Sequence, residues 1–277
     1  MTAIRKERQG QDMALTAGIV ALIVVFSLLP MVRLLQEIIL PGGRFSLDII
    51  RLGLIDETTW RATWNTLVVG LGGTLFALVL GVAVAILVSM SNVRQRQAFV
   101  LCFVTPLMIA PQVTALAWLQ LFGPSSPLLN MLGMAPPLGT RNPLYSPEGI
   151  VFLLGIQYAP LVFLIVRAGM RKLPRELVEA AQSSGAGWVR VLGTIILPLM
   201  TPSIVGAAAL TFVSCVGNFG IPAFLGIPAN YLVLPTLIYQ RLAGGGPAVL
   251  SEVAFLSVLI GVIAMIGIVM QDRIASR

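Results

Sequence analysis

The sequence predicts an all-α polytopic membrane protein with six transmembrane helices. Hydrophobic residues make up 57% of its 277 residues and charged residues only 10%, whereas soluble domains carry roughly 25% charged residues. The chain has no His, and Cys102 and Cys215 are its only cysteines. This composition excludes intrinsic disorder, a disulfide scaffold and any His-based metal or acid–base site.

Six apolar segments are long enough to cross a bilayer, which takes about 20 helical residues. They are residues 13–35, 63–90, 98–121, 149–166, 202–223 and 253–270. Pro106 and Pro111 interrupt the third segment, and the fifth is broken near Gly217. The only charged residue within these limits is Arg33, near an end, because a charge at the bilayer centre costs at least ~2.5 kcal/mol.

The predicted domain organisation is simple. Residues 1–12 form an N-terminal segment, and residues 13–277 form one transmembrane domain that includes a loop over 167–201. The first apolar segment exceeds the usual apolar stretch of about 7–15 residues in a signal peptide and lacks a following A-x-A site. We therefore interpret it as a retained helix.

The distribution of charge predicts the orientation. All of the formal net charge of +7 lies in the N-terminus, the loop at 91–97, the loop at 167–201 and the C-terminus, while the opposite segments sum to zero. Lys and Arg concentrate on the cytoplasmic side of membrane proteins. We therefore expect both termini in the cytoplasm, and the basicity needs no nucleic acid to explain it.

The loop at 167–201 carries a candidate docking element. Pro174 suits the first position of a helix that ends at Gly185 and Gly187, where a left-handed residue is convenient. A second short helix is expected from Trp188 to about residue 196, ended or kinked by Pro198. Two amphipathic helices at a glycine turn are suited to docking in a groove of a soluble partner. An interfacial loop lying on lipid headgroups is the alternative.

The spacing in this loop resembles the EAA loop of binding-protein-dependent type I ABC importer permeases, the MetI-like superfamily. That pattern is Glu-Ala-Ala, three residues, Gly, nine residues, then Ile-x-Leu-Pro. The matching positions are Glu179, Ala180, Ala181, Gly185, Ile195, Leu197 and Pro198. The resemblance implies that these residues couple the permease to its ATPase.

Further motifs resemble one branch of this superfamily. They are the stretches at 218–226 and 235–239, while the Asn65-Thr66-Leu67 opening of the second segment resembles the family as a whole. This branch serves ferric iron, 2-aminoethylphosphonate, thiamine and polyamines. The closest resemblance is to ferric-iron permeases, which often carry two six-span units in one chain. Ferric iron is therefore the expected substrate, with polyamine, 2-aminoethylphosphonate or thiamine as alternatives.

The resemblance also implies the partners. The chain has no G-x-x-x-x-G-K-[ST] motif, so ATP and Mg²⁺ would be used by two ABC ATPase subunits and no cofactor by this chain. A periplasmic solute-binding protein and a second permease, identical or homologous, complete the expected complex. The expected location is the bacterial inner membrane, and this chain is expected to be a transport subunit without catalytic residues.

A translocation path needs polar groups that face the centre of the bundle. The candidates are Gln112, Gln157, Ser214 and Asn218, with no metal ligand among them. Helix–helix hydrogen bonding is the alternative role for each. A stand-alone secondary transporter or channel is the alternative of another class, but it would predict intramembrane ionisable residues or inverted repeats, and neither is evident.

Overall fold

A computed structural model describes residues 13, 15–40, 48–90, 95–137, 139–246 and 249–275. These residues are helical with connecting loops and contain no strand, which confirms the predicted all-α class. The predicted N-terminal segment 1–12 lies outside the described residues. The chain divides into a smaller unit (residues up to 56, and 240–259) and a larger unit (57–239 and 260–277).

In the part of the chain that the structure describes, five helices are long and apolar enough to cross a membrane. They are Leu15–Ile39, Glu57–Met90, Pro147–Met170, Trp188–Val216 and Val249–Gln271. A sixth span exists if α5 (Arg96–Met108) and α6 (Pro111–Leu121) count as one, and these two helices are bent by 103°. The interruption predicted at Pro106 and Pro111 is therefore a sharp break in the chain.

The smaller unit contains η1 (Val24–Leu28), α2 (Leu29–Ile39), α3 (Asp48–Ile55) and parts of α13 (Leu234–Gly244) and α14 (Val249–Ala275). Arg241 makes two ion pairs in this unit, with Asp56 at 2.9 Å and with Glu252 at 3.4 Å. Ser251 donates a hydrogen bond of 3.2 Å to Glu37. These contacts join segments far apart in the sequence.

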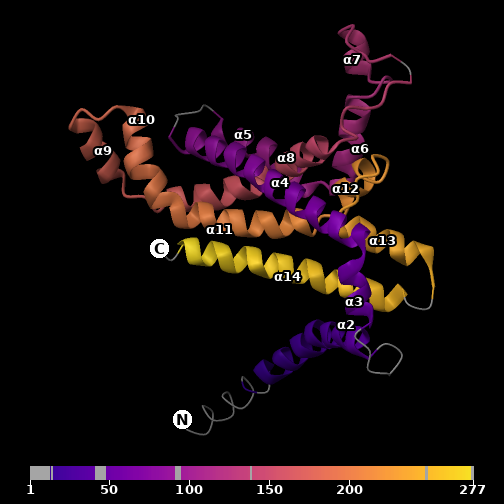
Figure 1. Ribbon diagram of the computed structural model, residues 1–277. Coiled ribbons are helices and arrows are strands. Elements are labelled where there is room, and N and C mark those ends of the chain that lie inside the picture. The colour runs from indigo at the N-terminus through magenta and orange to yellow at the C-terminus, as the bar shows by residue number, and fades with distance from the viewer. Residues whose placement is uncertain are drawn as a thin grey trace. The chain divides into compact units, whose positions relative to one another are not determined.

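The larger unit is built on α4 (Glu57–Met90), which packs against α8 (Pro147–Met170) and α11 (Leu197–Val216) (Figure 1). Small residues let these helices approach closely, as is usual in membranes. A Cβ atom on Gly81 would lie 2.6 Å from the carbonyl oxygen of Ala159, and one on Gly73 would lie 2.9 Å from Leu154. The glycines of α4 therefore define how near α8 can lie.

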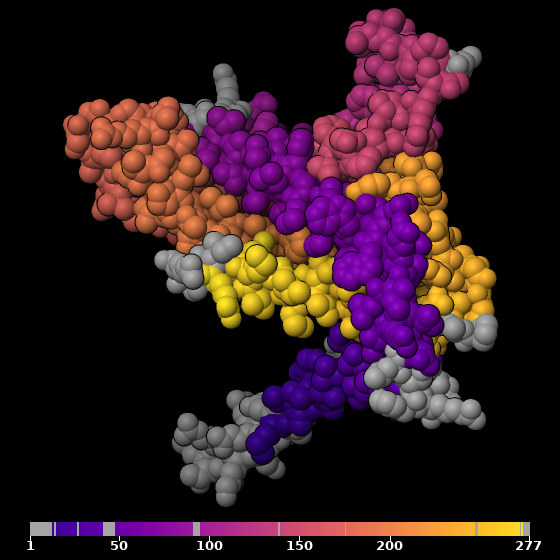
Figure 2. Space-filling view, viewed as in Figure 1, coloured from indigo at the N-terminus to yellow at the C-terminus, as the bar shows by residue number. Residues whose placement is uncertain are grey.

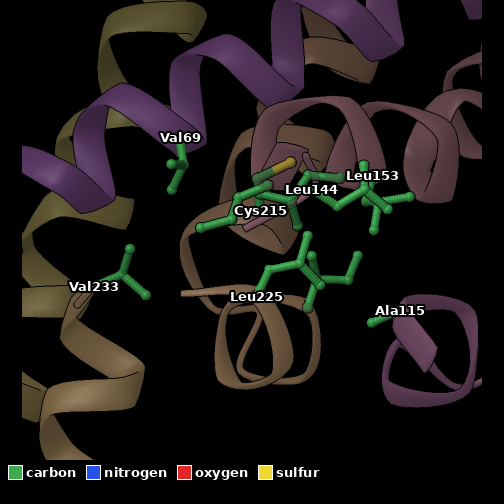
Figure 3. Packing of buried hydrophobic residues seen from close by; sticks show 10 residues of the cluster. Val69, Ala115, Leu144, Leu153, Cys215, Leu225 and Val233 are labelled. Atoms are coloured by element: carbon green, nitrogen blue, oxygen red, sulfur yellow. The ribbon is translucent and has the colours of Figure 1, made fainter. Parts of the chain in front are cut away.

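Two apolar clusters fill this unit. One contains Val69, Leu153, Cys215 and Leu225, contributed by α4, α8, α11 and α12 (Gly220–Leu225); Figure 3 shows these four side chains gathered together. The other lies between the C-terminal halves of α4 and α8 and includes the fully buried Phe163. The burial of Cys215 agrees with an apolar packing role.

The Asn-Thr-Leu motif fastens α4 to the loop before α13. Asn65 donates to the carbonyl oxygen of Leu232 at 2.8 Å, and the hydroxyl of Thr66 accepts from the amide of Leu234 at 2.8 Å. Thr236 also accepts from the amide of Val233. Two motifs about 170 residues apart in sequence thus satisfy one another's backbone groups.

Two prolines are accommodated by π-helical turns rather than by helix breaks. The π-helix η1 ends two residues before Pro30, and η3 (Leu192–Ile196) ends two residues before Pro198. Proline has no amide hydrogen and its ring crowds the carbonyl four residues earlier. A π turn shifts the hydrogen bonds by one residue and removes that conflict.

The predicted boundaries of the fifth span were therefore wrong. Pro198 does not end a separate helix, because α10 (Trp188–Val191), η3 and α11 run on as one span over Trp188–Val216. This span ends at Val216, and the last predicted residues belong to the separate helix α12, which begins at Gly220. The second span begins at Glu57, six residues earlier than predicted.

Candidate functional site

The predicted docking element is a helical hairpin at one end of the larger unit. It consists of α9 (Arg175–Ser183) and α10, and Figures 1 and 2 show it projecting from the bundle, at the opposite end from α7 (Pro127–Met131). The partly buried side chains Val178 and Ala181 pack against the cluster around Phe163. One face of α9 is thus anchored on the bundle.

The turn of the hairpin is a Schellman motif. The amide of Ala186 donates to the carbonyl of Ala181 at 3.1 Å, and that of Gly185 donates to Gln182 at 3.0 Å. Gly185 has a φ of +82°, a conformation that costs other residues about 1–2 kcal/mol. Gly187 has an ordinary φ of −65° as the N-cap of α10, so only one of the two predicted left-handed glycines is left-handed.

The start of α9 also differs in detail from the prediction. Pro174 is the N-cap residue, just outside the first turn, and has an extended ψ of 117°. Glu176 lies in the first turn, where the positive end of the helix dipole favours a carboxylate. The predicted helix is present, with its start moved by one residue.

The hairpin leaves a small apolar face uncovered. Leu177 is 47% exposed and Val189 is 81% exposed, and Ala180 is also exposed. The EAA carboxylate Glu179 is exposed, whereas Ala181, Ile195 and Leu197 are half-buried. Gly185 and Pro198 are exposed. Before the turn Glu179 and Ala180 are therefore accessible, and after it Ile195, Leu197 and Pro198 lead into α11.

A second cluster of predicted residues lies at the breaks in two helices. Gln157, which is 2% exposed in α8, donates to the carbonyl oxygens of Pro106 at 2.8 Å and Ile109 at 3.1 Å. These carbonyls lie at the bend between α5 and α6, where the helix loses its regular hydrogen bonds. The amide of Gln157 thus compensates the break.

Tyr158, the residue after Gln157 in α8, lies at the second helix break, between α11 and α12. Asn218 donates to the phenolic oxygen of Tyr158 at 2.9 Å and accepts from the amide of Ile221 at 3.0 Å. It therefore caps the start of α12 just after α11 ends. α12 also packs on α6, because a Cβ atom on Gly220 would lie 3.0 Å from Pro111 and Gln112. The two breaks meet beside the middle of α8.

The remaining two path candidates lie in α6 and α11. Gln112 lies in the first turn of α6 and is exposed, while half-buried Ser214 donates to the carbonyl of Leu210 in its own helix at 2.7 Å. The structure thus joins Gln157 and Asn218 through adjacent positions of α8, and gives no such link to Ser214. Sequence reasoning missed the carbonyl groups of Pro106 and Ile109 as partners, although the two prolines marked the place.

Comparison with known proteins identifies the family. The family of binding-protein-dependent transport system inner membrane components matches residues 52–277, and the chain belongs to it. The resemblance seen in the sequence is thereby confirmed. A crystal structure of a bacterial ABC transporter that imports the acidic polysaccharide alginate has the same fold. It gives a TM-score of 0.81 at 20% identity and covers 98% of this chain and 96% of its own.

Relatives carry names with different substrates. The probable ABC transporter permease y4fN of Sinorhizobium fredii is 26% identical over 74% of this chain, and the match spans 36% of y4fN. The 2-aminoethylphosphonate permease PhnU of Salmonella typhimurium, named as putative, is 25% identical over 85% of this chain and 82% of its own. Ferric permease FbpB of Actinobacillus pleuropneumoniae is 24% identical over 86% of this chain, but the match spans 35% of FbpB. The sulfoquinovosyl glycerol permease SmoG of Agrobacterium fabrum is 29% identical over 60% of this chain and 55% of its own.

Proposed function

We propose that this chain is the membrane-spanning permease of an ATP-driven importer and that the α9–α10 hairpin receives the motion of an ATPase. The observation that carries the proposal is the continuity of α10, η3 and α11 over Trp188–Val216. The hairpin is thereby joined to a helix of the bundle with no loop between them. Rigid-body rocking of packed helices is an established way to alternate access.

The accessible face of the hairpin is suited to binding in a groove on the surface of a soluble partner protein. Leu177, Ala180 and Val189 offer apolar contacts, and Glu179 adds a carboxylate at the edge. An amphipathic helix that presents such a face binds in grooves of soluble proteins. The partners that we propose are two ABC ATPase subunits, a second permease and a periplasmic solute-binding protein, in a bacterial inner membrane with cytoplasmic termini.

The docking role is tested by two matched glycine substitutions. We expect Gly185→Ala to strain the turn by about 1–2 kcal/mol because of its positive φ, and to lower co-purification with the ATPase. Gly187→Ala is the control, because Gly187 has an ordinary φ and a Cβ atom there would contact nothing within 4 Å. Glu179→Lys reverses the charge without straining the turn and should also weaken the complex.

These variants give a clear outcome. Folding of each variant is checked by its thermal unfolding, and uptake is measured with the full complex in proteoliposomes with and without ATP. If Gly185→Ala and Glu179→Lys both keep full complex formation and uptake, the hairpin does not dock the ATPase. Uptake by the chain alone, without ATP, would instead support a secondary transporter.

We infer that the transported solute is ferric iron delivered by the binding protein. The support is the resemblance of residues 218–226 and 235–239 to ferric permeases and the match to FbpB. PhnU makes 2-aminoethylphosphonate the first alternative, before polyamine and thiamine. Selectivity is assigned to the binding protein, since no Asp or Glu lies within the apolar segments predicted from the sequence.

Calorimetry on the cognate binding protein tests the substrate. We expect tight binding of ferric iron and no binding of spermidine or 2-aminoethylphosphonate. Binding of either organic ligand without ferric iron would replace the iron assignment and leave the importer proposal standing. Uptake of the bound ligand by the full complex then links the binding protein to this permease.

A further inference from the structure

A pocket of about 500 Å³ lies between the hairpin and the end of the bundle. Its bundle side is formed by Ser89 at the end of α4, Arg96 at the start of α5 and Arg171 just after α8. Its hairpin side includes Glu179, Gln182 and Trp188. The volume is in the range of small-molecule sites, and the walls combine charged and apolar side chains.

The pocket has a surplus of positive charge. Arg96 and Arg171 line it with Glu179 as the one carboxylate among the lining residues. A third guanidinium, that of Arg167, lies one helical turn before Arg171 at the end of α8. Three like charges this close are unfavourable without a counter-charge. The arrangement therefore favours an anion.

Several hydrogen-bond donors at or beside this pocket also lack an acceptor. Within the described residues, the hydroxyl of Ser89 and the Nε atoms of Arg96 and Arg167 are buried and make no hydrogen bond. A buried donor without an acceptor costs about 1–3 kcal/mol, and more when it is charged. A ligand that brings several acceptor oxygens would satisfy such donors. Phosphate does so, and arginine binds it through paired N–H groups.

The position of the pocket indicates where the phosphate comes from. Ser89 and Met90 end the span Glu57–Met90, and Met170 ends the span Pro147–Met170. The pocket thus lies at the depth where spans leave the hydrocarbon and where lipid phosphates lie. Met90, Met170 and Leu173 add apolar walls suited to the glycerol and first acyl carbons. Basic pockets between helices at the cytoplasmic side bind anionic headgroups.

We propose that this pocket binds a phosphate group, supplied by the headgroup of an anionic phospholipid, against Arg96, Arg171 and the hydroxyl of Ser89. Arg167, one helical turn before Arg171, adds a third positive charge near the pocket. Because α9 forms the other wall, a bound headgroup would brace the hairpin against the ends of α4 and α8. The proposal rests on Arg96, Arg171 and Ser89, which the ATPase docking role does not use, although Glu179 belongs to both places.

The test measures lipid retention by the full-length protein. Native mass spectrometry and fluorescence titration are performed with nanodiscs that contain phosphatidylglycerol, or phosphatidylcholine only. We expect phosphatidylglycerol to bind wild-type protein, and Arg96→Gln and Arg171→Gln each to weaken binding about tenfold, the loss of one charge-assisted hydrogen bond. Arg171→Lys keeps the charge and should recover part of the affinity. Arg190→Gln is the control, because Arg190 is exposed on the same hairpin and does not line the pocket.

A second arm distinguishes the source of the phosphate. Inorganic phosphate is titrated into wild-type protein in phosphatidylcholine nanodiscs. Binding of inorganic phosphate that depends on Arg96 and Arg171, with no preference for phosphatidylglycerol, assigns the pocket to a soluble phosphate and overturns the lipid source. Equal phosphatidylglycerol binding by wild-type, Arg96→Gln and Arg171→Gln proteins overturns the site itself. Each variant is compared only if it elutes as a single species and unfolds at the wild-type temperature.

Discussion

Asn218 donates a hydrogen bond of 2.9 Å to the phenolic oxygen of Tyr158. The bond links the start of α12 to the middle of α8, and the same Asn218 side chain caps α12 through Ile221. Both residues are therefore parts of one arrangement that stabilises a broken helix. Broken helices in membranes need such partners for their freed backbone groups.

A double-mutant cycle measures this coupling. We expect Asn218→Ala to lower the free energy of unfolding by about 1–2 kcal/mol, because it also removes the cap. Tyr158→Phe should cost about 0.5–1.5 kcal/mol. The two losses should be non-additive, as is normal for residues in contact. The measurement is denaturant unfolding of the purified protein. Ser214→Ala combined with Tyr158→Phe is the additive control, because Ser214 bonds only its own helix; strict additivity in the Asn218–Tyr158 pair would contradict the link.

Replacement of Gln157 should affect the bend between α5 and α6. Gln157→Leu removes the side-chain donor to the carbonyl oxygens of Pro106 and Ile109, and leaves Pro106 with the amide of Ile109 alone. We expect a loss of about 1–3 kcal/mol in unfolding free energy, with faster hydrogen exchange at the start of α6. Gln120→Leu makes the same substitution at an exposed position of α6 and should leave both measurements unchanged. Equal behaviour of the two variants would show that Gln157 does not hold the bend.

The close contact of α4 and α8 predicts a position-specific effect of one methyl group. Gly81→Ala places its Cβ atom 2.6 Å from the carbonyl oxygen of Ala159, so the helices must separate and the core loses contacts. Overpacking of this kind costs about 1–3 kcal/mol. Gly206→Ala in α11 meets nothing within 4 Å and should be neutral or slightly stabilising. Thermal unfolding in detergent measures both, and an unchanged midpoint for Gly81→Ala would contradict the packing described here.

The ion pairs of Arg241 predict a salt-sensitive loss of stability in the smaller unit. Arg241→Gln leaves Asp56 and Glu252 without their shared partner, and half-exposed pairs contribute up to about 1 kcal/mol. Arg61→Gln removes a pair with Glu57 in which both side chains are largely exposed and should have less effect. Unfolding is followed at low and high salt, where screening should reduce the Arg241 effect. A loss independent of salt would assign Arg241 a packing role.

The helical class and most spans were predictable because hydropathy acts locally. The apolar segments around α4, α8 and α14 fall where the sequence places them, since any helix in a bilayer must satisfy its own backbone and cover itself with apolar side chains. The α9 helix and its stop at Gly185 were also predictable. A left-handed residue is needed at that turn, and glycine adopts it at low cost.

The sequence did not predict how Pro198 is accommodated or which groups hydrogen-bond to the buried polar side chains. A proline read as a helix stop, Pro198, is accommodated by a π turn, and nothing in the neighbouring sequence distinguishes the two outcomes. Gln157 and Asn218 were recognised as polar groups in apolar segments, but their hydrogen-bond partners lie 51 and 60 residues away in sequence. Their partners follow from helix packing, which hydropathy does not specify.

The sequence by itself determined that this protein is a bundle of apolar helices with its basic residues gathered in a few loops, and it identified the hairpin by its spacing. Only the tertiary structure decided that α10 continues into α11, that two broken helices meet at α8, and that three arginines lie near one pocket. The physical reason is the range of the forces. Hydrophobic burial and turn preferences act within a few residues of the chain, whereas close packing and hydrogen bonding across helices depend on which surfaces meet.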